Sequence, residues 1–224
     1  MGERTWTEVE RATVLVPVGS LEQHGPHLPL DTDTRIAAAV ARRAADPSML
    51  LAPPLAYGAS GEHEGFAGTL SLGHAALRAV LVELGRSAGA WASRVVFVNG
   101  HGGNLPTVAD AAVQLRDEGR DVAWSGCVVP DGDAHAGRTE TSILLALDPS
   151  LVRLDVAEVG NTASLRELMP VLTSDGVRAA SPNGVLGDPR GATAAEGEAL
   201  LVTLVENLRG ELMRWKPDER GRLR

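Results

Sequence analysis

Residues 19–34, GSLEQHGPHLPLDTDT, combine cation-binding side chains with residues that prevent a regular helix. The stretch contains two histidines, two aspartates and one glutamate, together with two prolines and two glycines. Glu22 and His24 are two positions apart, so in an extended segment both side chains project to the same side and can face one ion. Asp31 and Asp33 have the same spacing before an expected helix, where one can cap the helix while the other binds a metal. The stretch therefore suggests a metal-binding loop.

Two other segments carry the same kinds of side chain. His101 lies between two glycines in VNGHGGN, and these small neighbours leave room for a metal or a substrate close to the backbone. His135 and Glu140 lie in PDGDAHAGRTE. Taken singly, a loop histidine is usually structural, and NGHGGN could be only a turn. The expectation of a functional site therefore depends on whether these segments meet in space.

Alternating strand and helix patterns predict that they do meet. Short valine-rich runs that end in turn residues indicate buried strands at 13–19, 94–100 and 121–129. Apolar residues at helical spacing indicate helices at 33–46, 73–92, 105–119, 138–149 and 193–215. This alternation is typical of an α/β fold with a mostly parallel sheet and helices on both faces, in which ligands bind beyond the carboxyl ends of the strands. Four of the six histidines fall on predicted loops at that edge.

Length and composition favour one domain over residues 1–224. The chain has 224 residues, 44% of them hydrophobic, and shows no repeat and no break in composition. Residues 177–191, VRAASPNGVLGDPRG, contain too many glycines and prolines for a helix or a strand and predict a long ordered loop or a lid.

Charge and cysteine content exclude several classes of partner. The formal net charge of −8 disfavours nucleic acid, and no apolar run is long enough for an export signal or a membrane span. Cys127 is the single cysteine, which excludes an intrachain disulfide; it is expected to pack as a small apolar side chain. A cytoplasmic location is therefore expected.

The candidate ligands favour a transition-metal site. They are Glu22, His24, Asp33, His101 and Glu140. A mixture of histidine and carboxylate suits zinc, iron or manganese better than calcium or magnesium. Five ligands exceed the needs of one open catalytic ion, which predicts two metals per chain with Asp33 as the bridge. Such a site favours hydrolysis of an amide, with His135 moving a proton to the leaving amine.

Three ordered motifs, GSLEQHGPHLPLDTDT, NGHGGN and HAGRTETS, resemble those of the creatininase family of metal-dependent amidohydrolases. The likeness runs from about Val14 to the last helix. It implies a three-layer α/β sandwich, a homo-oligomer and a binuclear metal site. The resemblance also assigns roles, with Glu22 and His24 as the Glu-x-His ligand pair, Asp33 as the bridge, His101 as a further ligand and His135 as the proton-transfer residue.

One position departs from the family pattern. Family members that hydrolyse creatinine have a glutamate ligand two residues after the histidine that corresponds to His101, and this chain has Gly103 there. Creatinine is therefore disfavoured as the substrate, and Glu140 is the nearest replacement for the missing carboxylate.

Further stretches, among them LAYGASGEHEGFAGTLSLG and GVLGDPRGATAAEG, resemble the mycofactocin-maturation branch of the family. That branch implies a peptidase that releases the crosslinked C-terminal Val-Tyr pair of a modified precursor peptide.

Other interpretations remain open from the sequence. A small-molecule amidohydrolase or a deformylase would use the same metal centre with a different pocket, and a non-catalytic metal-binding protein would need the ligands but not His135. His63, in the glycine-rich stretch 57–69, either lines a cleft or is structural. His74, near the start of a helix, is expected to be structural.

Overall fold

The computed structural model describes all 224 residues and has a four-stranded sheet at its centre. The strands are β1 (Thr13–Val18), β2 (Met49–Leu51), β3 (Arg94–Asn99) and β4 (Val122–Gly126). Their order in the sheet is β2-β1-β3-β4, and every neighbouring pair is parallel. β1 and β3 lie at the centre and are almost wholly buried, as expected for a parallel sheet covered on both faces.

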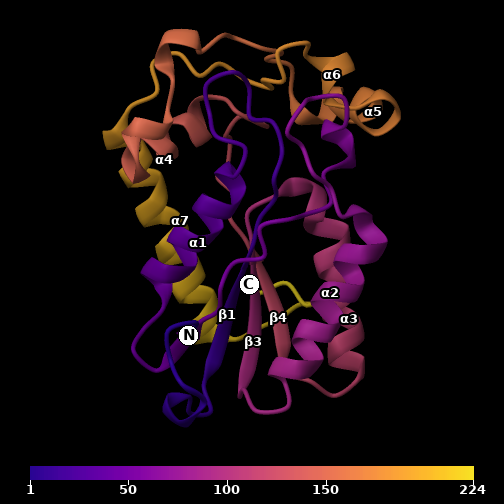
Figure 1. The fold of residues 1–224 in the computed structure, drawn as a ribbon, viewed down its shortest axis with the longest axis vertical. Coiled ribbons are helices and arrows are strands. Elements are labelled where there is room, and N and C mark those ends of the chain that lie inside the picture. Colours follow the sequence, from indigo (N-terminus) through magenta and orange to yellow (C-terminus); the bar gives the residue numbers. More distant parts are fainter.

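Helices cover both faces of the sheet, so the predicted three-layer α/β sandwich is confirmed (Figure 1). On one side lie α1 (Thr32–Ala44), α4 (Arg138–Leu147) and α7 (Ala194–Arg214). On the other side lie α2 (Gly73–Ala88) and α3 (Leu105–Asp117). The five predicted helices are all present, and most of them end a few residues earlier than predicted.

Side chains of alternate strand residues enter the two cores. Leu15 of β1 packs with α1 and α7, whereas its neighbours Val14 and Val16 pack with α2 and α3. The same alternation places Val96 in the first core and Phe97 in the second. Complete burial of such an aliphatic or aromatic side chain stabilises the fold by about 1.5–3 kcal/mol. The valine-rich runs therefore form strands because both of their faces are apolar.

Several elements were not predicted. They are β2, α5 (Leu165–Asp175) and α6 (Val177–Ala180), with short 3-10 helices at Trp6–Glu8 (η1), Gly61–His63 (η2), Gly102–Asn104 (η3), Pro149–Leu151 (η4) and Leu154–Val156 (η5). The prediction of a loop over 177–191 is wrong for its first four residues, which form α6. α5 and α6 lie together at one end of the molecule (Figure 1).

The single cysteine agrees with its predicted packing role. Cys127 is a free thiol that packs, partly buried, against the core beneath α7. Burial raises the pKa of the thiol to about 12, so it stays protonated at neutral pH. None of the helices has the length and apolar character that a membrane crossing requires.

The contact between α4 and α7 gives a test of the packing. A methyl group on Gly197 of α7 would overlap the carbonyl oxygen of Ser142 in α4, which cannot move away without disturbing its helix. We expect Gly197→Ala to lower the free energy of unfolding by about 1–3 kcal/mol, measured by urea denaturation.

Gly210 of the same helix is the matched control. A methyl group there meets only the guanidinium end of Arg214, a flexible side chain. Gly210→Ala should therefore keep or raise the stability, by up to about 1 kcal/mol, because alanine favours a helix over glycine. Equal losses in the two variants would contradict the close packing of α4 on α7.

Candidate metal centre

The six predicted site residues meet at the carboxyl edge of the sheet. Glu22 and His24 lie on the loop after β1, and His101 lies directly after β3. His135 lies between β4 and α4, while Asp33 and Glu140 lie in the first turns of α1 and α4. Their possible ligand atoms form three groups: Glu22, His24 and His135; Glu22, Asp33 and His101; and His24, Asp33 and Glu140. In each group the atoms lie within 4.8 Å of one another.

Two glycines allow the start of α1 to lie directly against the strand ends. A methyl group on Gly19, after β1, would overlap the backbone of Thr34, and one on Gly100, after β3, would lie 2.5 Å from the carbonyl oxygen of Asp33. Any side chain at either position would push α1 away from the sheet. This close approach places the Asp33 carboxylate between the loops that follow β1 and β3.

Glu22 is fully buried, and neither of its carboxylate oxygens has a hydrogen-bond partner. His101 Nδ1 lies 3.1 Å and His63 Nε2 3.2 Å from Oε1. Burial acts to raise the pKa of Glu22, but the nearby imidazoles outweigh it and lower the pKa to about 2. The carboxylate is therefore ionised, and a buried ionised carboxylate requires a positive partner.

Asp33 lies between His101 and His24. Its Oδ2 accepts a hydrogen bond from Ser20 Oγ at 2.7 Å and lies 3.1 Å from His101 Nδ1. Its Oδ1 lies 3.2 Å from His24 Nε2. Against the effect of burial, these imidazoles hold the pKa of Asp33 well below its ordinary value. Asp33 is thus an ionised carboxylate with one oxygen directed to each side.

His24 presents one defined nitrogen to the carboxylates. Its Nδ1–H donates to the backbone carbonyl of Glu22 at 3.1 Å, which leaves Nε2 facing Asp33 at 3.2 Å and Glu140 Oε2 at 4.0 Å. Burial opposes protonation, yet the charge of Asp33 and its neighbours raises the pKa of His24 to about 10. The surroundings of Nε2 therefore favour a positive charge there, which a metal ion can supply in place of a proton.

Glu140 is held by the loop that precedes α4. Its Oε2 accepts a hydrogen bond from the backbone N–H of Ala136 at 2.6 Å. Burial raises the pKa of Glu140 to about 7, and the nearby His24 only partly offsets this. The carboxylate can therefore join the cluster as an anion once a cation is present.

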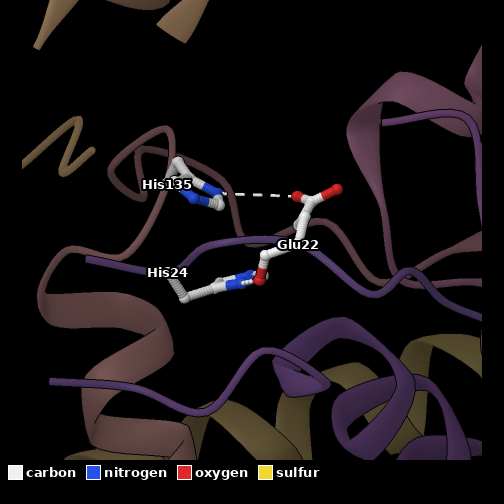
Figure 2. Close-up of side chains that lie close together, drawn as sticks. All are labelled: Glu22, His24 and His135. Atoms are coloured by element: carbon white, nitrogen blue, oxygen red, sulfur yellow. Dashed lines mark hydrogen bonds and ion pairs between the residues drawn. The ribbon is translucent and has the colours of Figure 1, made fainter. Parts of the chain in front are cut away.

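His135 lies farther from the carboxylates than His24 and His101 do. Its Nε2–H donates to the backbone carbonyl of Gln23 at 2.8 Å, and its Nδ1 lies 4.0 Å from Glu22 Oε1 (Figure 2). The backbone of His135 pairs with Leu186, from the loop after α6. Burial, together with the charges of His24 and His63, lowers the pKa of His135 well below its ordinary value. Nδ1 is therefore an unprotonated nitrogen that faces the cluster.

The structure adds three residues that were not among the predicted site residues. Gln23 Nε2 donates to His63 Nδ1 at 2.9 Å and to the carbonyl of Gly184 at 3.1 Å. His63 Nε2 lies 3.2 Å from Glu22 Oε1, so this residue, whose role is open from the sequence, is buried in contact with the cluster. Glu62 lies 3.3 Å from His101 Nε2. The glycines around residues 61–65 were the only signal in the sequence.

Other candidate residues have structural roles. Asp31 occupies the N-cap position of α1, but its side chain accepts no capping hydrogen bond and instead pairs with Arg35 Nε at 2.6 Å. The capping role suggested for the pair of aspartates is therefore not performed by the Asp31 side chain. His74 Nδ1 and Thr107 Oγ1, 2.8 Å apart, link α2 to α3, as expected of a structural histidine.

The charge balance of the cluster fits bound cations. No lysine or arginine forms an ion pair with Glu22, Asp33 or Glu140; only histidines lie within ion-pair distance. Imidazole nitrogens and carboxylate oxygens together form a donor set that suits zinc, iron or manganese. Glu22, His24 and Asp33 each belong to two of the three ligand groups. Asp33 directs Oδ1 to His24 and Oδ2 to His101, so two cations could share its carboxylate.

Comparison with known proteins agrees with this geometry. The sequence model of one family, described as creatinine amidohydrolase, matches residues 2–212. The mycofactocin precursor peptide peptidase of Mycolicibacterium smegmatis is 59% identical over 94% of this chain and 88% of its own. The creatinine amidohydrolase of Pseudomonas putida is 32% identical over 93% of this chain and 94% of its own.

A 2-amino-5-formylamino-6-ribosylaminopyrimidin-4(3H)-one 5'-monophosphate deformylase from Methanothermobacter thermautotrophicus is 36% identical over 66% of this chain and 64% of its own. Among solved structures, a creatininase variant of the Zn-Zn type matches with a TM-score of 0.82 and 29% identity, covering 97% of this chain and 98% of that one. A manganese creatininase matches over the same shares with a TM-score of 0.79 and 28% identity.

Replacing Asp33 tests whether two cations share its carboxylate. Asp33→Asn keeps the size of the side chain but removes the charge that two cations would share, so we expect metal content per chain to fall to a small fraction. Elemental analysis after desalting measures the metal, and circular dichroism checks that the fold is retained.

Asp31→Asn is the matched control, because Asp31 is two residues away and pairs with Arg35 at the surface. It should keep the metal content of the unaltered protein. Full metal content in Asp33→Asn would show that the cluster does not depend on this carboxylate.

Proposed function

This chain belongs to the creatininase family and is a hydrolase of amide bonds, and we propose that its substrate is the modified precursor peptide of mycofactocin. The bond cleaved would be the peptide bond before the crosslinked C-terminal Val-Tyr pair. The observation that supports this most strongly is the 59% identity, over nearly the whole chain, to the precursor peptide peptidase of Mycolicibacterium smegmatis. The cluster of carboxylates and histidines described above also supports a metal-dependent hydrolysis.

We propose two divalent transition metals per chain. Glu22, Asp33 and His101 would hold one, and His24, Asp33 and Glu140 the other, with Asp33 as the bridge. Fe²⁺, Zn²⁺ or both suit these donors, and Mn²⁺ also fits. The buried carboxylate of Glu22, which has no hydrogen-bond donor, and the absence of any lysine or arginine partner support this assignment. When bound, such ions activate water and polarise the carbonyl oxygen of the scissile amide.

His135 would move the proton. Its Nδ1 carries the free lone pair, because the carbonyl of Gln23 keeps the ring proton on Nε2. At 4.0 Å from Glu22 it is close enough to reach a water molecule at the carboxylates. It takes a proton from the attacking water and returns it to the nitrogen of the departing Val-Tyr pair. The backbone pairing with Leu186 holds the segment that carries this ring.

The second candidate function is deformylation of a small molecule, supported by the similarity to the Methanothermobacter thermautotrophicus deformylase. That relative matches about two thirds of this chain at 36% identity, which is a weaker likeness in both extent and identity. Creatinine remains the least favoured substrate because position 103 is a glycine.

Incubation with the modified precursor peptide tests the proposed function. Mass spectrometry should detect the crosslinked Val-Tyr pair and the shortened precursor, and no formate should be released from a formamide substrate. Formate release without peptide cleavage would favour the second candidate.

The His135→Ala variant serves as the internal control for this reaction. We expect a decrease in kcat of about 10²–10⁴-fold, the usual contribution of a proton-transfer residue, with metal content unchanged. Loss of metal in this variant would instead make His135 a ligand.

We also propose a homo-oligomer that works in the cytoplasm, where the free Cys127 stays reduced. The apolar stretch ALLVTLVENL of α7 gives little support to this, because Leu201, Leu204 and Leu208 pack into the core of their own chain. Val202 is 44% exposed and Met213 82% exposed. Light scattering at micromolar concentration should give a mass of at least twice the 23.4 kDa of one chain; a monomer would contradict the proposal.

A further inference from the structure

Position 103 is a glycine, and the space beside it is occupied by another part of the chain. A methyl group on Gly103 would overlap the Oε1 atom of Glu62 and would lie 2.5 Å from His101 Nε2 and 2.7 Å from the carbonyl oxygen of Ala59. The carboxylate of Glu62 therefore takes the volume in which a side chain at position 103 would begin. Glu62 comes from η2, some forty positions earlier in the chain.

The orientation of His101 shows what Glu62 contacts. His101 Nδ1 faces the carboxylates, 3.1 Å from Glu22 Oε1 and 3.1 Å from Asp33 Oδ2. Its Nε2 points away from them and lies 3.1 Å from the carbonyl oxygen of Ala59 and 3.3 Å from Glu62 Oε1. Both neighbours of Nε2 are acceptors, so Nε2 carries a ring proton. Nδ1 faces two carboxylates, and its lone pair is available to a cation that takes the place of the proton there.

Glu62 does not itself reach the candidate metal positions. It belongs to none of the three groups of possible ligands, and it contacts His101 on the nitrogen that those groups do not use. A carboxylate that accepts the outer N–H of a metal-binding histidine fixes the tautomer and increases the electron density on the nitrogen that binds the metal. The influence of Glu62 on a cation must therefore pass through His101.

The backbone around Glu62 is fixed by several contacts. The N–H of Ala59 donates to Asn104 Oδ1 at 2.8 Å, and the N–H of Ser60 donates to Ser71 Oγ at 2.9 Å. On the outer side, Gly176, between α5 and α6, lies directly against the carbonyl oxygen of Glu62. The next residue, His63, contacts Glu22. The short turn η2 is thus held between the metal-site loops and the α5–α6 segment.

We propose that Glu62 is a positioning residue of the metal centre. Its carboxylate accepts the Nε2–H of His101 and so holds Nδ1 towards the cation that Glu22 and Asp33 share with it. The chain thereby places a carboxylate next to His101 from η2 rather than from position 103. This inference rests on the metal site of the proposed function but not on the identity of its substrate.

Retention of zinc by the purified, zinc-loaded protein tests this role without any peptide. Titration with a chromophoric chelator should show that Glu62→Ala binds one of its two zinc ions about 10–100-fold more weakly, the usual effect of losing such a partner. The second ion, at His24, Asp33 and Glu140, should be retained. Glu62→Gln keeps an acceptor oxygen but loses the charge, so its affinity should lie between those of Glu62→Ala and the unaltered protein.

Glu64→Gln is the matched control, since Glu64 is exposed, two residues away and outside the cluster. It should bind zinc like the unaltered protein. The inference is overturned if both Glu62 variants keep full affinity, if Glu64→Gln weakens binding equally, or if Glu62→Ala loses both ions together with a lowered melting temperature.

A spectroscopic measurement on the unaltered protein tests the geometry directly. In ¹⁵N-histidine NMR spectra of the zinc-loaded protein, His101 should show a protonated Nε2 and a metal-bound Nδ1. Zinc on Nε2 would overturn the inference. If zinc binding depends on Glu62 while the precursor peptide is not cleaved, the positioning role stands and the proposed substrate is wrong.

Discussion

Three acidic side chains, Glu22, Asp33 and Glu140, converge at the carboxyl edge of the sheet without a lysine or an arginine among them. Placing like charges together in a buried environment is strongly unfavourable unless positive charge is supplied. Protonated imidazoles could supply it, and the raised pKa values of His24 and His101 reflect that demand. Bound cations meet the same demand without protons. Metal binding should therefore stabilise the folded chain as well as activate water, because the folded state brings the ligands together and the unfolded state does not.

The fold brings these acidic side chains together from short loops that are distant in sequence. Parallel strands end at the same edge, so the segments after β1, β3 and β4 become neighbours although about a hundred residues separate the first from the last. Gly19 and Gly100 then let the first turn of α1 lie against the strand ends, which brings Asp33 to the centre. The same architecture brings one histidine and one carboxylate to each side of Asp33, with Glu22 and His101 on one side and His24 and Glu140 on the other.

The sequence predicted much of this arrangement and missed parts for identifiable reasons. The valine-rich strands and the long helices were predictable. The strands are buried on both faces and the helices on one face, and each kind of burial leaves a regular apolar pattern in the sequence. β2 was not, since its three residues are too few for a pattern, and α5 contains Pro170, which favours a break. Glu62 and Gln23 were missed because their roles depend on contacts with His101 and His63 across distant parts of the chain. Gly103 was noted as an absence, but only the structure shows that another side chain fills its space.

Backbone carbonyl groups orient three histidine rings of the candidate site. His24, His101 and His135 each donate one ring N–H to a main-chain carbonyl, of Glu22, Ala59 and Gln23 respectively. The donating nitrogen is Nδ1 in His24 and Nε2 in the other two, so each ring directs its other nitrogen towards the cluster. For His24 and His101 that nitrogen lies within 3.2 Å of a carboxylate oxygen, close enough for a shared ion, whereas for His135 it lies 4.0 Å away. The larger separation sets His135 apart from the two closer rings, which supports the separate role proposed for it.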